Sequence, residues 1–179
     1  MGPVLALIDL QRIFARPDSA WAAPDFQRVM EPTKKLIEIL SPQVIFTRFV
    51  APEKPVGSWV TYYELYPFAL QPPDSADYQL VDEFRGAPTL DKTTFGAWGP
   101  ELAERVGPGG HLVLAGVTTD CCVITTALAA VDAGVYVQVV EDACAGSDDE
   151  SHRKAIDIMR LYSPMLEIVT ADHFRRLNP

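Results

Sequence analysis

Residues 112–123, LVLAGVTTDCCV, decide how this chain folds. The apolar first half predicts a buried strand, Gly116 predicts a break, and the residues that follow predict a helix over 124–133. A cysteine pair, Cys121 and Cys122, therefore stands where a strand gives way to a helix. The unpaired N–H groups and the partial positive charge of a helix start lower the pKa of a thiol. The stretch thus predicts a nucleophilic cysteine.

The flanking sequence alternates short apolar runs with amphipathic stretches. We expect strands over 4–8, 43–47, 111–115, 135–140 and 166–169, and further helices over 25–40, 101–106, 148–162 and 171–177. Helices between strands that are apolar throughout are typical of a parallel sheet covered on both faces. The predicted fold class is α/β, a three-layer Rossmann-like fold with a mostly parallel central sheet. We expect a single domain over residues 1–179.

A long insertion at about 48–90 interrupts this pattern. It is rich in proline, and its aromatic residues include Trp59, Tyr62, Tyr63, Tyr66, Phe68 and Tyr78. A structureless loop of this length is uncommon in a compact domain and is often a lid or a binding loop. The aromatic residues predict that the segment packs on the protein body or on a second subunit. A buttress over the sheet edge and a substrate lid are equal alternatives.

Composition and charge exclude several classes of function. The net charge is −9 and the pI is near 4.7, with no basic stripe, so neither nucleic acid nor an anionic membrane is an expected partner. No segment approaches the ~20 apolar residues of a membrane span. Three cysteines form no disulfide framework, which predicts a cytoplasmic protein. His111, His152 and His173 lack zinc-like spacing, so no metal or cofactor is expected.

If residues 89–90 also belong to a parallel strand, a carboxylate, an ammonium and a thiol converge on one edge of the sheet. Asp9 follows the first strand, Lys92 follows the apolar pair 89–90, and the cysteine pair follows the strand over 111–115. Ligands of open parallel sheets bind beyond the carboxyl ends of the strands. There a carboxylate can accept a thiol proton, an ammonium can hold the carboxylate, and the thiol can attack a carbonyl. Taken singly, each residue has a plainer role, as a core cysteine, a turn-capping aspartate or a solvated lysine.

Three motifs follow one another along nearly the whole chain: DLQ at 9–11, KTTFGAW at 92–98 and GVTTDCCV at 116–123. Together they resemble the signature of the isochorismatase-like cysteine hydrolases. This family includes nicotinamidases, N-carbamoylsarcosine amidases, ureidoacrylate amidohydrolases and biuret hydrolases. Three separate motifs in order are far more specific than any one of them.

The resemblance implies hydrolysis of an amide or ureido C–N bond through a thioester. Cys122 would be the nucleophile, because the family's cysteine directly precedes the valine, and Cys121 fills a variable position. Asp9 would be the general base and later the general acid, with Lys92 as its charged partner. The resemblance also implies a cis peptide before Thr118, which would direct the N–H groups of Thr118 and Cys122 into an oxyanion hole.

The substrate pocket is less well defined by sequence. Phe14 matches a pocket-lining position of the family, and Trp98 and the aromatic residues of 48–68 are further candidates for its wall. Nicotinamidases carry a metal-binding Asp-x-His cluster where this chain has RFV at 48–50, which argues against nicotinamide hydrolysis. Arg48 has two interpretations, a contact to a substrate carboxylate and a structural ion pair, of which the second is slightly favoured.

Two other functions stay open at this stage. One is isochorismatase-type hydrolysis of a vinyl ether by Asp9 and Lys92 without a covalent step. The other is a non-catalytic or redox-responsive role, in which Cys121, Cys122 and Cys144 undergo oxidation. The expected partners are a small-molecule substrate and further copies of the chain, as a homodimer or homotetramer. The sequence specifies neither the substrate nor the number of subunits.

Overall fold

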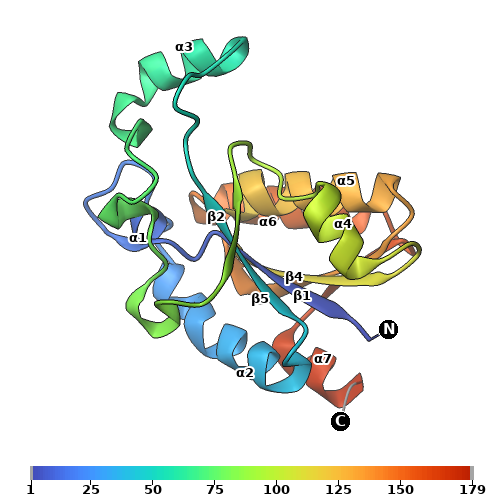
Figure 1. Cartoon of the computed structure of the whole chain (residues 1–179). Coiled ribbons are helices and arrows are strands. Elements are labelled where there is room, and N and C mark those ends of the chain that lie inside the picture. The colour runs from blue at the N-terminus through green and yellow to red at the C-terminus, as the bar shows by residue number, and fades with distance from the viewer. Residues whose placement is uncertain (1, 178–179) are drawn as a thin grey trace.

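Six parallel strands form one central sheet in the computed structural model, which describes residues 2–177 (Figure 1). The strands are β1 (Val4–Ile8), β2 (Val44–Phe49), β3 (Thr89–Lys92), β4 (His111–Val117), β5 (Tyr136–Ala145) and β6 (Leu166–Val169). Their order is β3-β2-β1-β4-β5-β6, and every neighbouring pair is parallel. From β1 the chain adds β2 and β3 on one side of the sheet, and it then adds β4, β5 and β6 on the other side of β1. The edge between β1 and β4 is therefore the switch point at which such sheets bind ligands.

Helices cover both faces of this sheet (Figure 1). They are α1 (Arg12–Ala15), α2 (Met30–Leu40), α3 (Ser58–Leu65), α4 (Pro100–Val106), α5 (Ile124–Asp132), α6 (Asp149–Arg160) and α7 (Ala171–Leu177). Helices α2 and α7 lie on one face, and α4, α5 and α6 lie on the other. The predicted α/β fold class, with a parallel sheet between two helical layers, is confirmed.

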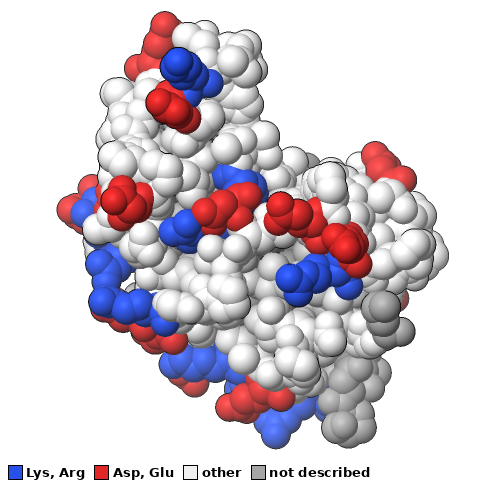
Figure 2. Space-filling view, in the orientation of Figure 1, with Lys and Arg blue, Asp and Glu red and all other residues white. Residues whose placement is uncertain are grey.

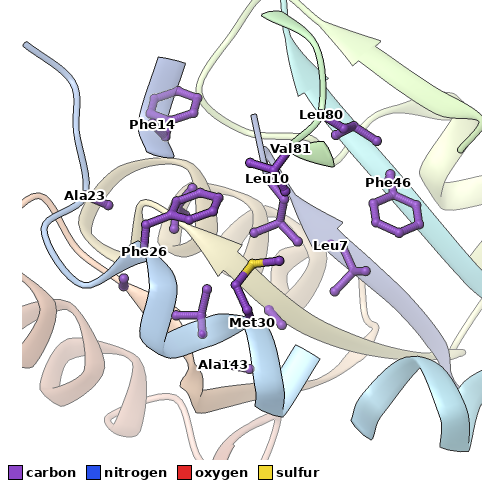
Figure 3. Packing of buried hydrophobic residues seen from close by; sticks show 14 of the residues in the cluster. Leu7, Leu10, Phe14, Ala23, Phe26, Met30, Phe46, Leu80, Val81 and Ala143 are labelled. Atoms are coloured by element: carbon purple, nitrogen blue, oxygen red, sulfur yellow. The ribbon is translucent and has the colours of Figure 1, made fainter. Parts of the chain in front are cut away.

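Strand β1 shows why these residues form a central strand. Its side chains alternate between two apolar cores, because successive residues of a strand point to opposite faces. Leu5 and Leu7 belong to the core under α2, while Ala6 and Ile8 belong to the core under α4 and α5. Figure 3 shows the first of these cores, which includes Leu7 of β1 and Met30 of α2. Both faces being buried, the strand reads as a continuous apolar run.

The insertion at 48–90 is more ordered than the sequence predicts. It contains α3, three short 3-10 turns (Pro67–Ala69, Ala76–Tyr78 and Asp82–Phe84) and strand β3. Helix α3 projects from the body of the molecule (Figure 1). Apolar alternation does not reveal α3, because only Tyr63 of its eight residues is buried.

Several further boundaries differ from the prediction, among them those of β5 and of the helix after β4. Strand β5 continues past residue 140 to Ala145, and its register against β4 shifts between Leu114 and Gly116. The predicted helix after β4 begins as a π-helical turn, Thr119–Val123, before α5. In the part of the chain that the structure describes, no helix has the length and apolar character needed to cross a membrane.

Candidate active site

Asp9, Lys92 and Cys122 come together at the carboxyl edge of the sheet. Asp9 directly follows β1, Lys92 ends β3, and Cys122 lies in the π-helical turn after β4. The Nζ atom of Lys92 lies 2.7 Å from Oδ2 of Asp9, and both side chains are buried. Both charges are close enough to act on the Cys122 thiol. The three residues that the motifs single out therefore form one cluster at the switch point of the sheet.

Asp9 is held by a neighbour that sequence reasoning missed. The hydroxyl of Thr47 donates to Oδ1 of Asp9 at 2.7 Å and accepts from the Asp9 backbone N–H at 3.1 Å. Thr47 is fully buried on β2, and Asp9 itself has a left-handed backbone with φ of 50°. The sequence signal was available, because Thr47 is a small polar residue near the end of an apolar strand next to β1.

The ion pair leaves Asp9 able to accept a proton. Oδ2 of Asp9 accepts no well-aligned hydrogen bond from residues 2–177, so the Lys92 ammonium is its close partner there. Lys92 also donates to the carbonyl of Thr94 at 2.9 Å and stands 5.4 Å from the centre of the Phe49 ring. Burial alone would lower the pKa of Lys92, but the charge of Asp9 raises it overall. Lys92 therefore stays a cation beside the carboxylate.

The two adjacent thiols have opposite pKa shifts. Contact with Cys121, burial and the charge of Asp9 raise the pKa of Cys122 well above its usual value, although Lys92 opposes the shift. The same contact between the thiols lowers the pKa of Cys121. The predicted lowering thus holds for Cys121 and is wrong for Cys122, because Cys122 is buried beside a carboxylate. Cys122 rests as a neutral thiol and needs a base to become a nucleophile.

The turn between β4 and α5 places the thiol at the cavity. The peptide between Val117 and Thr118 is cis. Gly116 has φ of 118°, and a Cβ atom there would lie 2.1 Å from the carbonyl oxygen of Ile8. Only glycine fits this approach of β4 to β1. The Thr118 carbonyl then accepts from the N–H groups of Cys121 and Val123, at 3.2 and 3.1 Å, which closes the turn.

A cavity of about 310 Å³ opens in front of the cysteine pair. Its wall consists of Phe14, Ala20, Trp21, Ala22, Phe49, Tyr62, Tyr66, Phe95, Thr118, Asp120, Cys121, Cys122 and Ser147. The expected pocket residue Phe14 is among them. The wall thus combines six aromatic residues with the polar residues Thr118, Asp120 and Ser147. This is the usual composition of a small-molecule site.

Two expected pocket residues lie elsewhere. Arg48 pairs with Asp91 through two hydrogen bonds, Nε to Oδ1 at 2.8 Å and Nη2 to Oδ2 at 2.6 Å. Its guanidinium is therefore engaged in the structural ion pair, and Arg48 does not line the cavity. Trp98 packs against the core under α4 and α5 and is also absent from the wall. Within the same motif it is Phe95, and not Trp98, that lines the cavity.

The insertion at 48–90 forms part of the cavity wall. Trp21, which sequence reasoning missed, stacks on Phe14 with centroids 6.0 Å apart, and contacts Tyr62 and Tyr66 at 5.9 and 5.7 Å. Tyr63, like Tyr78, is buried against the body of the protein. The segment is therefore both a buttress and a wall. Burial raises the pKa of Tyr62, which keeps its hydroxyl protonated near the thiols.

A second polar contact beside the cavity was also missed. The N–H and hydroxyl of Ser147 donate to Oδ1 and Oδ2 of Asp120, at 2.8 and 2.7 Å. This contact ties the π-helical turn to the loop after β5. The next residue, Asp148, caps α6 by accepting from the Ser151 N–H at 2.8 Å. Within residues 2–177, no three or more His, Cys, Asp or Glu side chains converge as a metal site.

Comparison with known proteins adds the family. The family model of the isochorismatase domain matches residues 3–172. No curated protein sequence matches the chain. Among solved structures, a cysteine hydrolase from Pseudomonas syringae pv. phaseolicola superposes with a TM-score of 0.79 at 18% identity, covering 97% of this chain and 91% of that chain.

Two amidases of known structure share the same fold. An N-carbamoylsarcosine amidase from Thermoplasma acidophilum gives a TM-score of 0.74 at 21% identity, with coverage of 96% of this chain and 98% of that one. A nicotinamidase from Bacillus subtilis gives 0.73 at 19% identity, with coverage of 94% and 99%. At such identities the similarity concerns the fold, whereas the family model spans almost the whole chain. The chain belongs to the isochorismatase family of hydrolases.

Proposed function

We propose that this protein hydrolyses an amide or ureido C–N bond of a small molecule, with Cys122 as the nucleophile. One observation carries the proposal: a buried Asp9–Lys92 ion pair adjoins a cysteine that lines an aromatic cavity. An ion pair that only stabilises the fold does not require a thiol and a cavity beside it. A carboxylate that accepts a proton from a nucleophile and later returns it must lie next to that nucleophile at a substrate cavity.

The first half of the reaction forms a thioester. Asp9 takes the proton of the Cys122 thiol while the sulfur attacks the substrate carbonyl, which becomes a tetrahedral oxyanion. The C–N bond then breaks, and the proton passes from Asp9 to the departing nitrogen, which leaves as ammonia or an amine. Because the pKa of Cys122 is raised, the thiolate forms only when the base acts. The Lys92 ammonium lies 2.7 Å from Oδ2 of Asp9, where it holds the carboxylate in place for the transfer.

The second half regenerates the enzyme. A water molecule gives one proton to Asp9 and adds to the thioester carbonyl, the C–S bond breaks, and Asp9 returns the proton to the Cys122 sulfur. The product is the carboxylic or carbamic acid. The N–H groups of Thr118 and Cys122 are our candidates to stabilise the oxyanion in both halves, since both residues line the cavity.

The test compares Cys122→Ala, Asp9→Asn and Cys121→Ala with the wild type on a panel of amides and ureas, with ammonia release as the readout. We expect Cys122→Ala and Asp9→Asn to lose at least about a thousandfold in kcat/KM, and Cys121→Ala to stay active. Intact-protein mass spectrometry should detect an acyl adduct on the wild type during turnover.

The outcomes separate the proposal from its two alternatives. If Cys122→Ala keeps hydrolytic activity toward a vinyl ether, Asp9 and Lys92 act without a covalent step and the thioester route is wrong. If the wild type hydrolyses neither the amides and ureas nor the vinyl ether, and peroxide forms a disulfide between its cysteines, the result supports the redox role. Cys144 is fully buried on β5, where burial raises its pKa to about 12, so it is a poor candidate for such a linkage.

A further inference from the structure

The charges around the cavity are unbalanced. Asp120 is the one acidic residue in its wall, and no lysine, arginine or histidine of the described chain lines it. The cation of the proposed catalytic cluster, Lys92, is already paired with Asp9 at 2.7 Å and does not belong to the wall. A substrate in the cavity therefore faces a carboxylate with no counter-ion.

The partners of Asp120 leave acceptor capacity for a ligand. Both of its hydrogen bonds come from Ser147, through an N–H and a hydroxyl, and both donors are neutral. Within residues 2–177, no cationic side chain lies within ion-pair distance of Asp120. A carboxylate offers about four acceptor positions, so about two remain open. Asp120 is partly exposed, lines the cavity and precedes Cys122 by two residues.

The rest of the wall favours the same kind of ligand. Six of the lining residues are aromatic: Phe14, Trp21, Phe49, Tyr62, Tyr66 and Phe95. The face of an aromatic ring carries partial negative charge and attracts a cation within about 6 Å of its centre. An anion would meet these faces and the carboxylate together, and would lose its hydration without compensation.

We propose that the cavity takes a small amide or urea that carries a positive charge outside its scissile group, and that Asp120 selects this charge. The proposal rests on the proposed function for the position of the scissile bond. At about 310 Å³ the cavity is at the small end of ligand pockets, which suits a compact molecule with one ring or a short chain.

The test measures binding in a protein that cannot form the thioester. Calorimetry with Cys122→Ala compares three benzamides that differ at the para position: aminomethyl (a cation), hydroxymethyl (neutral) and carboxymethyl (an anion). We expect the cation to bind about tenfold more tightly than the neutral compound, as one carboxylate and cation–π contacts allow, and the anion to bind most weakly. In Cys122→Ala/Asp120→Asn the cation and the neutral compound should bind within about threefold of each other.

Asp120→Asn is the matched change because asparagine keeps an oxygen acceptor for the Ser147 N–H. A thermal unfolding midpoint close to that of the parent shows that the loop is still tied down. The proposal is overturned if the cation preference survives Asp120→Asn, if the anion binds as tightly as the cation, or if none of the three compounds binds at millimolar concentration. This measurement involves no reaction of the thiol. A preference for the cation can therefore be found even if the wild type hydrolyses no amide, and hydrolysis can be found even if there is no such preference.

Discussion

Asp9 joins several constraints at a single residue. It is fully buried, its backbone is left-handed, one carboxylate oxygen accepts from Thr47 and the other faces Lys92. A buried carboxylate is tolerated only when it is paired and hydrogen-bonded. The partners of Asp9 come from two other strands, so its orientation depends on the sheet and not on its own loop.

Replacing Thr47 tests whether this orientation matters for catalysis. Thr47→Val keeps the shape but removes the hydroxyl, which leaves Oδ1 of Asp9 without its donor. We expect kcat/KM to fall roughly ten- to hundredfold through misplacement of the base, and the free energy of unfolding to fall by about 1–3 kcal/mol. Thr47→Ser retains the hydroxyl and should keep most of the activity. Equal losses in both variants would point to packing instead.

Removing both charges of the Asp9–Lys92 pair together should destabilise the protein less than the two single losses would suggest. Lys92→Met leaves a buried carboxylate without a cation and should cost about 3–5 kcal/mol of unfolding free energy. The double variant Asp9→Asn/Lys92→Met removes both charges, so its loss should be clearly smaller than the sum of the two single losses, while activity stays absent. Urea denaturation measures all four proteins. Additive losses would mean that the two charges do not depend on each other.

At the scale of elements, the connection between β4 and α5 determines where the thiol lies. Gly116 lets β4 approach the backbone of Ile8, and the chain then makes a cis peptide and one π-helical turn. The loop after β5 ties this turn down through Ser147 and Asp120. The position of Cys122 thus depends on three elements.

A pair of glycine substitutions separates steric fit from backbone preference. Gly134→Ala, after α5, introduces a Cβ into open space at φ of 81° and should cost only about 1–2 kcal/mol. At Gly116 the same change drives a Cβ into the Ile8 carbonyl, so the loss of stability should be well beyond that range. Chemical denaturation measures both. Similar costs at the two positions would show that β4 can move away from β1.

At the scale of the whole molecule, the parallel order of the strands gathers residues that are distant in sequence at one edge. It also buries groups whose protonation then stabilises the fold. Burial raises the pKa of Tyr63 to about 12, and the pKa of Lys92 is raised by Asp9 against the effect of its burial. Burial also raises the pKa of Tyr136 to about 12.

These shifts predict steep loss of stability in alkali. A group whose pKa is higher in the folded than in the unfolded state contributes fully below its unfolded value, about 10 for tyrosine and lysine, and loses this contribution as the pH rises. The urea midpoint should therefore fall sharply between about pH 10 and pH 12. The urea midpoint of Tyr63→Phe should fall less over this pH range. At pH 7 this variant should be no less stable than the wild type, because within residues 2–177 the buried Tyr63 hydroxyl has no hydrogen-bond partner. Parallel curves for both proteins would contradict this origin.

Self-association is the second prediction for the whole molecule. Five of the eight large apolar side chains exposed among the described residues belong to the projecting region around α3: Val56, Val60, Leu65, Phe68 and Leu70. Figure 2 shows a lobe there with few charged groups. Such patches mark interaction surfaces, so we expect a homodimer or homotetramer in sedimentation velocity at micromolar concentration. Leu65→Lys should weaken this association, whereas the same change at Leu161, which is similarly exposed but lies outside the α3 region, should not. A monomeric wild type would contradict the expectation.

The sequence alone determined five of the six strands, the parallel α/β class and the positions of Asp9, Lys92 and Cys122. These follow from local patterns, because a strand buried on both faces is apolar throughout and the three motifs stand at the ends of β1, β3 and β4. Only the tertiary structure decided that Thr47 orients Asp9, that Trp21 and α3 wall the cavity, and that Arg48 pairs with Asp91. It also decided that the pKa of Cys122 is raised. Each of these depends on side chains from separate segments meeting at particular distances, and contact and burial are properties of the packed chain rather than of any stretch of it.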